Sequence, residues 1–330
     1  MLKNPFVTGR NKTVYIYVGL VIVLLLFPLV VSSTFYIHIL ILSFIYVIAA
    51  GSLRLISTSG QISMGHAGFM GIGAYVSIYL SKFLGVSPWI SMAIAALITL
   101  IIALIVGIPF ARLRGIYFTM ITLFFGLGAL SIEQLFSDYT GGYSGIAGIP
   151  ALFSTDSKIP YYYFFLILVT VCLIIMFRLE HSRIGQTWKA VAQSYSVASS
   201  IGINELQQRV LVFAIGCAFA GLAGAGLAHY SLVLSQSNFN LLASMYLIVY
   251  VLVGGIASFA GPIIGTAILV MIPEMSRSLK DYVPLLFAAI MLIVLFTMPK
   301  GLAGLPAQVK GWFHRKNKGN TPKEVINNAS

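Results

Sequence analysis

The stretch Gly60-Gln-Ile-Ser-Met-Gly-His-Ala-Gly-Phe-Met-Gly-Ile-Gly-Ala-Tyr75 combines five glycines with long apolar side chains. In water, that much glycine would weaken a helix. In a membrane, small residues instead let helices approach closely, and a glycine-rich segment can also be unwound. We expect close helix packing to account for most of these glycines, so the stretch predicts a tightly packed segment inside a membrane.

The composition of the whole chain agrees with this. Of its 330 residues, 59% are hydrophobic and 8% are charged, against about 25% charged in a soluble domain. Too little polar surface remains to cover a soluble core, and disordered chains are polar and poor in aromatic residues. Cys172 and Cys217 both lie in apolar runs, which favours buried cysteines over a disulfide framework.

Ten apolar segments are candidates for spans of about 20 residues. Backbone in lipid must satisfy its own hydrogen bonds, so we expect an all-α polytopic membrane protein of about ten transmembrane helices. The eighth and ninth segments are short and could form one broken hairpin joined at Gly254-Gly255. The first segment is too long for a typical signal peptide, and we expect it to be retained. The segments are Val14–Val31, Phe35–Ile56, Ile62–Leu80, Trp89–Pro109, Ile116–Phe136, Tyr161–Phe177, Val210–Tyr230, Leu241–Ile256, Ser258–Pro273 and Tyr282–Met298.

The positions of lysine and arginine predict the orientation. With the N-terminus in the cytoplasm, sixteen of these residues fall inside and four outside, namely Lys82, Lys158, Arg277 and Lys280. This bias follows the positive-inside rule. It predicts a cytoplasmic N-terminus at 1–13, a membrane domain at 14–298 and a basic cytoplasmic tail at 299–330. The tail could be solvated or could touch anionic headgroups.

The sequence lacks the signature motifs of several function classes. The chain has no phosphate-binding loop of the Walker type, no His-Glu-x-x-His, no Cys/His cluster with metal spacing and no Gly-x-Ser-x-Gly elbow. Among the acidic residues, only Glu133 lies in a predicted span, whereas ion-coupled carriers usually need intramembrane ionisable groups. We therefore expect neither an enzyme nor a metal site, and an energy source outside this chain.

Polar residues in the predicted spans are candidates for a translocation path. Ser63 and His66 are three residues apart and would share a helical face, where they could line a path, bond to a neighbouring helix or sit at the interface. Glu133 lies near the outer end of its span, where we expect it to snorkel to the interface, although a role at an outer gate is the alternative. Arg112 and Arg114 need only be topology signals.

The inner loop at 178–209 has amphipathic character. Ile184, Trp188, Val191 and Tyr195 recur at helical spacing, and Gly202 fits a helix C-cap. Such a helix could pack into a groove on a soluble partner or lie flat on the membrane. Sequence patterning alone leaves both open.

An ordered set of motifs over residues 35–305 resembles the M-type permease subunits of bacterial ABC importers for branched-chain amino acids and related solutes. The likeness begins with the glycine-rich stretch quoted above. Further blocks follow in family order: Arg112–Thr119 with Ile121–Leu123, Thr140–Pro150, His181–Gly185, Gly202–Asn204, Phe213–Gly226, Val253–Ile256, Gly261–Gly265 and Met298–Leu302.

The resemblance implies a transport subunit of the bacterial inner membrane that binds no cofactor itself. ATP would bind to two cytoplasmic ATPase subunits. A second, homologous permease would complete the path, and a substrate-binding protein would deliver the solute from outside. Urea, short amides and other amino acids are alternative substrates. A self-sufficient secondary carrier or channel is the alternative from another class.

The resemblance also assigns the inner loop to ATPase coupling, through Arg183, Gly185, Trp188 and Gly202. One departure is Ala192-Gln193-Ser194, where the family commonly has a charged Arg-Glu-Asn-like stretch. Either the ATPase contact is less electrostatic here, or the partner differs. We assign a second set of residues to the translocation path: Ser63, His66, Glu133, Gly141 and Gly142.

Overall fold

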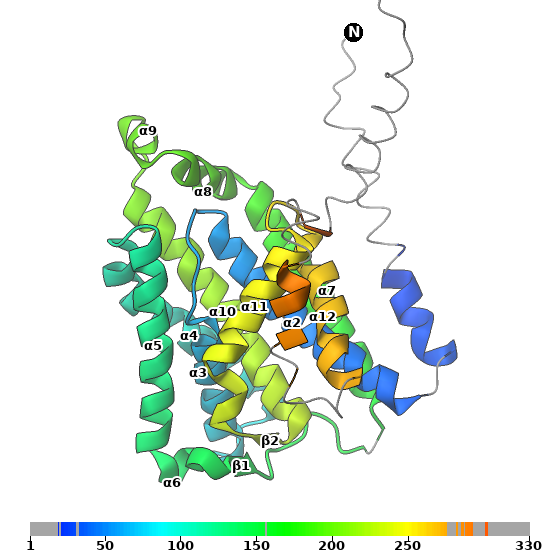
Figure 1. The fold of residues 1–330 in the computed structure, drawn as a ribbon. Coiled ribbons are helices and arrows are strands. Elements are labelled where there is room, and N and C mark those ends of the chain that lie inside the picture. The colour runs from blue at the N-terminus through cyan, green and yellow to red at the C-terminus, as the bar shows by residue number, and fades with distance from the viewer. Residues whose placement is uncertain are drawn as a thin grey trace, which may run out of the picture.

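The computed structural model describes residues 33–155 and 157–275, together with residues 19, 21–30, 282, 285–286, 288–292 and 301–302. The described chain is a bundle of helices with short connections at its two ends (Figure 1). Six helical segments are long and apolar enough to cross a membrane: α2 (Thr34–Ser57), α4 (Pro88–Ala111), α5 (Ile116–Leu135), α7 (Ile159–His181), α10 (Glu205–Ser231) and Gln236–Gly254, which contains α11.

The remaining elements are shorter. Apolar helices cover Val21–Val30 and α12 (Gly261–Met275), and α3 (His66–Ile78) runs on into a π-helical turn, η1 (Tyr79–Phe83). At one end of the bundle lie α8 (Arg183–Gln193) and α9 (Tyr195–Ser200); α6, β1 and β2 lie at the opposite end (Figure 1). The elements at that opposite end are α6 (Ser137–Thr140), η2 (Gly142–Ser144), β1 (Ile146–Ala147), β2 (Val233–Leu234) and η3 (Gln236–Phe239). Helix α11 (Leu241–Gly254) follows η3 and runs back through the bundle.

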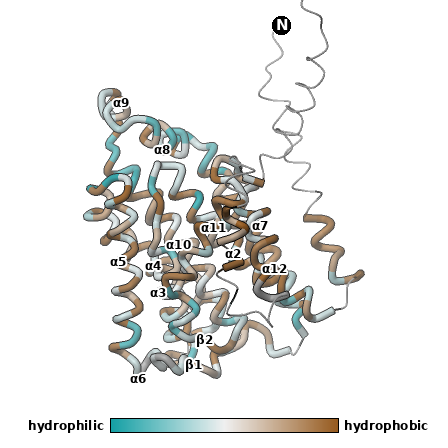
Figure 2. The backbone as a smooth tube through the Cα atoms, viewed as in Figure 1, coloured by the Kyte–Doolittle hydropathy of each residue, from teal (hydrophilic) through white to brown (hydrophobic). Residues whose placement is uncertain are grey.

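The structure confirms an all-α polytopic membrane protein. Its only sheet in the described ranges is the antiparallel pair β1–β2, with Ile146 opposite Leu234. Hydrophobic residues run along the bundle helices, whereas hydrophilic residues are frequent in α8 and α9 (Figure 2). The count of ten stays a prediction because parts of the first and last predicted spans, and most of the basic tail, lie outside the described residues.

Helices α2 and α10 are the most buried of the long helices. Most of α2 and α10 is buried by other elements, whereas α4, α5 and α7 expose most of their residues. Lipid is as apolar as leucine, so small residues that allow close backbone approach set where membrane helices meet. Here Gly73 of α3 lies against Gly221 of α10, and Gly224 of α10 lies against the Met70 backbone of α3. The expectation that close packing explains most of the glycines is confirmed at these positions.

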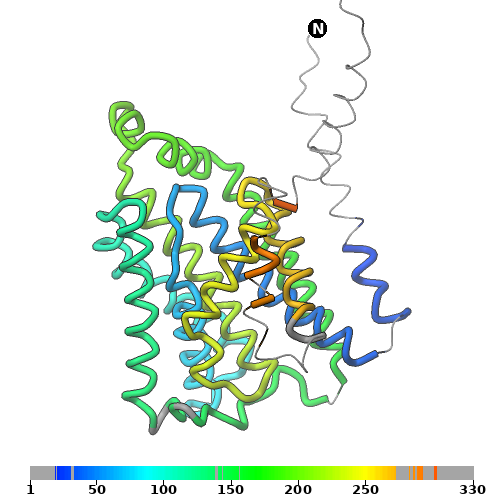
Figure 3. The backbone as a smooth tube through the Cα atoms, in the orientation of Figure 1, coloured from blue at the N-terminus to red at the C-terminus, as the bar shows by residue number. Residues whose placement is uncertain are grey.

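The glycine-rich stretch is not helical throughout. Helix α3 begins at His66, and residues 61–65 form an extended connection from α2 (Figure 3). The expectation that Ser63 and His66 share a helical face is therefore wrong. Non-helical backbone is tolerated within a membrane only where protein satisfies its polar groups.

Side chains of α5 and α11 supply those hydrogen bonds. Thr119 Oγ1 donates to the Ile62 carbonyl at 3.0 Å, and the Met64 amide donates to Thr122 Oγ1 at 3.1 Å. The Ala67 amide donates to Ser244 Oγ at 3.0 Å. Three polar side chains thus replace the helical partners that this backbone lacks.

The short eighth and ninth predicted spans are separate helices, α11 and α12. They form the hairpin that the sequence left open, with the Gly254-Gly255 backbone packed directly against Gly261. Gly255 has a φ of 107°, a conformation that residues with a Cβ rarely adopt. Glycine at the turn therefore permits both the chain reversal and the close contact.

We predict that Gly73→Ala destabilises the chain whereas Gly128→Ala does not. Both positions are helical, so alanine gains the same helix propensity of about 1 kcal/mol at each. A Cβ at Gly73 would overlap the Gly221 backbone, while nothing lies within 4 Å of a Cβ at Gly128. The measurement is thermal unfolding of the detergent-solubilised chain. Equal melting temperatures for the two variants would contradict the proposed backbone contact.

Candidate functional site

The inner loop folds as two capped helices rather than one. Ser182 Oγ accepts a hydrogen bond from the Gly185 amide at 3.3 Å at the start of α8. Ser194 Oγ accepts from the Val197 amide at 3.5 Å at the start of α9. Serine at an N-cap satisfies a free amide of the first turn. Ser194, part of the departure from the family pattern, therefore separates the two helices.

The apolar face of α8 is buried against the bundle. Trp188 and Val191 have no exposed surface. Gly185 lies so close to the carbonyls of Leu179 and Glu180 that any side chain would overlap the end of α7. These contacts fix α8 to α7 and leave its opposite face uncovered.

Arg183 and Gly202 lie on the uncovered side of the loop, and both are exposed. Gly202 follows α9 with a φ of 82°, and its amide donates to the Ser199 carbonyl at 3.0 Å. The Ile203 amide donates to the Ala198 carbonyl at 3.1 Å, which gives a C-cap of the expected kind. A non-glycine residue would strain this turn.

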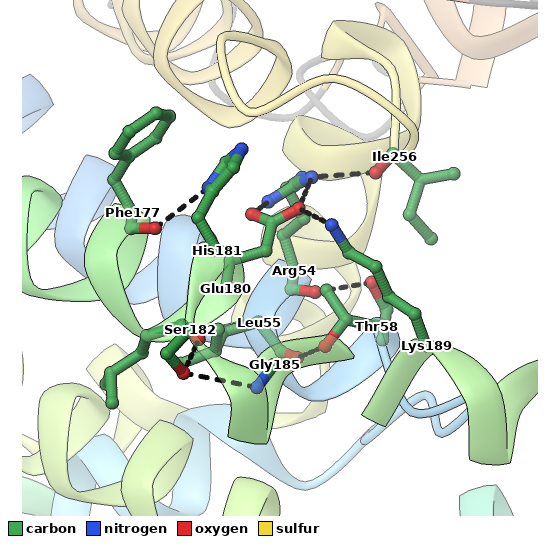
Figure 4. A network of polar contacts seen from close by, with 12 residues as sticks. Arg54, Leu55, Thr58, Phe177, Glu180, His181, Ser182, Gly185, Lys189 and Ile256 are labelled. Carbon is green, nitrogen blue, oxygen red and sulfur yellow. Dashed lines mark hydrogen bonds and ion pairs between the residues drawn. The ribbon is translucent and has the colours of Figure 1, made fainter. Parts of the chain in front are cut away.

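A buried ion pair connects the loop to the bundle (Figure 4). Arg54 of α2 donates from its two terminal nitrogens to the Glu180 carboxylate of α7 at 2.6 and 3.0 Å. Lys189 of α8 lies 3.1 Å from the same carboxylate. Arg54 Nε also donates to the Ile256 carbonyl at 3.1 Å, and the guanidinium lies over the Phe259 ring. One carboxylate therefore connects α2, α7 and α8, and Arg54 extends the connection to the α11–α12 turn.

A second arginine network lies at the same end of the bundle. Arg209 of α10 is buried and donates to the carbonyls of Ala111, at 2.6 Å, and Leu113. Its guanidinium lies 5.4 Å from the centre of the Tyr195 ring of α9. Arg114 pairs with Glu205 and lies over the same ring. These contacts join the α4–α5 turn to α9 and α10, so Arg114 does more than mark topology.

Sequence reasoning missed these two networks. Glu180 lies just beyond the predicted end of its span, and its partner Arg54 is 126 residues away. The available signal was Arg54 itself, a charge at the end of a long apolar run. Burial of an arginine requires hydrogen-bonded partners, but sequence patterning does not identify them.

The two inner residues of the predicted translocation path are both fully buried. His66 Nε2 lies 2.8 Å from Ser52 Oγ of α2, so the histidine bonds to a neighbouring helix. Ser63 Oγ has no hydrogen-bond partner among the described residues. The structure thus connects His66, but not the Ser63 hydroxyl, to α2 by a hydrogen bond.

The outer residues lie towards the other end of the bundle. The Glu133 side chain is 8% exposed, so the expectation that it snorkels to the interface is wrong. Gly141 and Gly142 follow α6 with φ values of 70° and 50° and shape a tight turn. Thr140 joins this turn to α5, since its Oγ1 donates to the Glu133 carbonyl at 2.5 Å. The translocation role of all five residues stays a prediction.

The helices and loop networks define a multi-pass membrane protein with an anchored helical loop at one end. Comparison with known families makes the assignment specific. Residues 35–298 match the family described as the permease component of the branched-chain amino acid transport system. The chain belongs to this permease family.

Curated relatives agree with that assignment. The chain is 28% identical over 327 residues to the high-affinity branched-chain amino acid transport system permease protein LivM of Escherichia coli K12, covering 90% of this chain and 77% of the relative. It is 27% identical over 285 residues to the corresponding LivH protein of Salmonella typhimurium, covering 78% and 91%. No solved structure gives a significant match.

We predict that Glu180→Gln destabilises the chain much more than Glu205→Gln. Removing one partner of a buried ion pair leaves an uncompensated charge and costs about 3–5 kcal/mol, whereas a partly exposed pair contributes about 1 kcal/mol or less. Arg54 and Glu180 are both buried, while the Arg114 side chain is 53% exposed. Thermal unfolding in detergent measures the difference. Equal shifts for the two variants would show that the Arg54–Glu180 pair is dispensable.

Proposed function

We propose that this chain is a permease subunit of an ATP-driven importer for branched-chain amino acids in the bacterial inner membrane. The observation that carries the proposal is the family match over residues 35–298. Similarity to both LivM and LivH, two permease proteins of one named transport system, supports pairing with a second, homologous permease. Two cytoplasmic ATPases and an external substrate-binding protein would complete the importer.

The geometry of α8 and α9 favours docking to a soluble partner over lying flat on the membrane. A helix that lies on a membrane inserts its apolar face, but Trp188 and Val191 are already buried against the bundle. The exposed side of the loop carries Arg183 together with exposed apolar side chains, Ile184, Val197 and Ile201. A mixed surface on rigid helices suits a protein interface. We assign this surface to the ATPase.

The proposed orientation places α8 and α9 in the cytoplasm. Helices α2 and α7 end at the α8 end of the bundle, and α10 starts there (Figure 1). This alternation, together with the bias of sixteen cationic residues against four, supports ten spans with both termini cytoplasmic. The opposite end, with α6 and the β1–β2 pair, would then receive the substrate-binding protein.

One observation favours a second candidate function. Glu133 is a buried acidic residue inside α5, and such groups often carry protons in secondary carriers. A carrier of that kind would transport without ATPase subunits. Uptake by this chain alone, driven by an ion gradient, would support that alternative.

We predict that Arg183→Glu and Gly202→Leu each uncouple transport while the fold is retained. Reversing an exposed charge removes a contact from the docking surface, and a side chain at Gly202 strains the turn that positions α9. Both variants should retain less ATPase during purification and lose at least about 90% of ATP-driven uptake in proteoliposomes, the tenfold change given by 1.4 kcal/mol.

Lys158→Glu is the control for this experiment. It makes the same charge reversal before α7, at the opposite end of the bundle. It should retain the ATPase like the unmodified chain. Normal ATPase retention and normal uptake in both loop variants would contradict the docking assignment.

A further inference from the structure

Three polar side chains of the bundle carry buried oxygen atoms that have no hydrogen-bond partner among the described residues. They are Tyr75 of α3, Glu133 of α5 and Gln236 of η3. Among the described residues, neither carboxylate oxygen of Glu133 has a partner, and the Tyr75 hydroxyl and Gln236 Oε1 also lack one. All four atoms are buried. Native proteins seldom leave such groups unpaired, so the cluster needs an explanation.

The surrounding contacts show that the three side chains converge. A Cβ at Gly71 would lie 2.9 Å from Glu133 Oε1 and 3.3 Å from Phe239. Tyr75 follows Gly71 by one turn of α3, and its ring centre lies 6.4 Å from that of Phe239. Gln236 Nε2 donates to the Leu130 carbonyl at 2.5 Å, one turn before Glu133. The Glu133 carboxylate therefore packs against Gly71 and Phe239, one turn along α3 from Tyr75.

The side chains of Tyr75, Glu133 and Gln236 suit a cation that can donate hydrogen bonds. A carboxylate and an amide carbonyl are acceptors, and the two aromatic rings can face a positive charge. The ion pairs of the described residues lie at the α8 end and do not involve Glu133. One carboxylate and one amide oxygen are too few for a hard metal ion, which takes six or more oxygens. An ammonium group, with its three N–H donors, matches the set.

An apolar groove begins one helical turn away. It lies between α3, α5 and α11 and shares Phe239 with the polar cluster. Its other walls include Gly68, Leu127 and Leu130. Gly68 precedes Gly71 by three residues, and Leu130 precedes Glu133 by three, so the groove continues along the same helix faces. The groove holds only about 10 Å³ in this structure, so an aliphatic side chain fits beside the ammonium group only when α3, α5 and α11 separate.

We propose that Tyr75, Glu133 and Gln236 form the membrane subsite for the ammonium group of an amino acid in transit, with its aliphatic side chain in the adjacent groove. This inference rests on the proposed function. Gly71 leaves the carboxylate unobstructed on the α3 side, because a Cβ there would lie 2.9 Å from Glu133 Oε1.

The test uses the complete importer in proteoliposomes, with [³H]leucine as the probe and the same binding protein for every variant. Glu133→Gln keeps the shape but removes the charge that pairs with the ammonium. Uptake by the assembled importer should fall about tenfold or more, as expected for losing a charged hydrogen bond. Glu133→Asp retains the charge and should recover part of the uptake.

Several outcomes would overturn the inference. Unchanged leucine uptake by Glu133→Gln would show that Glu133 is not an ammonium ligand, while the importer function stands. ATP-independent uptake driven by a proton gradient and abolished by Glu133→Gln would make Glu133 a proton carrier instead. If the unmodified importer takes up no amino acid, the proposed function fails and this inference fails with it.

A second variant covers the case in which Glu133→Gln does not assemble. Gln236→Met removes an acceptor from the same subsite but lies in the short turn η3, outside the long helices. Its uptake should fall at least about threefold, which corresponds to the loss of a neutral hydrogen bond. Normal uptake by an assembled Gln236→Met importer would overturn the subsite.

Discussion

The backbone contact between α3 and α10 is the constraint on which the rest of the structure depends. Gly73 and Gly221 meet without side chains between them, and Gly224 lies against the Met70 backbone. In lipid no hydrophobic force draws helices together, so such close packing supplies the association. It holds α3 at the centre of the bundle, where its other faces contact α5 and η3. The glycine-rich sequence is therefore what positions both the buried connection at 61–65 and the polar cluster around Glu133.

Rigid connections at the α8 end complement this central contact. The Arg54–Glu180–Lys189 network joins α8 to α2 and α7, and Arg209 joins α9 and α10 to the α4–α5 turn. A partner that displaces α8 and α9 would therefore act on the helices that also hold α3. Charged hydrogen bonds are the stronger ones, so we expect the loop and the bundle ends to move together.

Hydropathy and charge predicted much of the fold because membrane helices must satisfy their own backbone. The predicted spans that became α2, α4 and α5 agree with the structure within a few residues, and Gly202 caps α9 as expected. The third span was predicted to begin at Ile62, which is wrong because α3 begins at His66. Side chains distant in sequence, Thr119, Thr122 and Ser244, form hydrogen bonds with the backbone between Ile62 and Ala67 instead.

The sequence predicted less of the candidate site than of the fold. Glu133 was expected at the interface, yet tertiary packing buries it beside Gly71 and Phe239. Glu180 went unnoticed because its partner Arg54 lies in another helix. Local patterns report which residues face lipid or water, whereas pairing between remote polar residues depends on how the helices pack.

Affinity purification of this chain from its native membrane in mild detergent, with mass spectrometry of the co-purifying proteins, tests the central claim most directly. The account predicts recovery of an ATPase and a second, homologous permease. Recovery of this chain alone, stable and monodisperse, would contradict it and favour a self-sufficient carrier or channel.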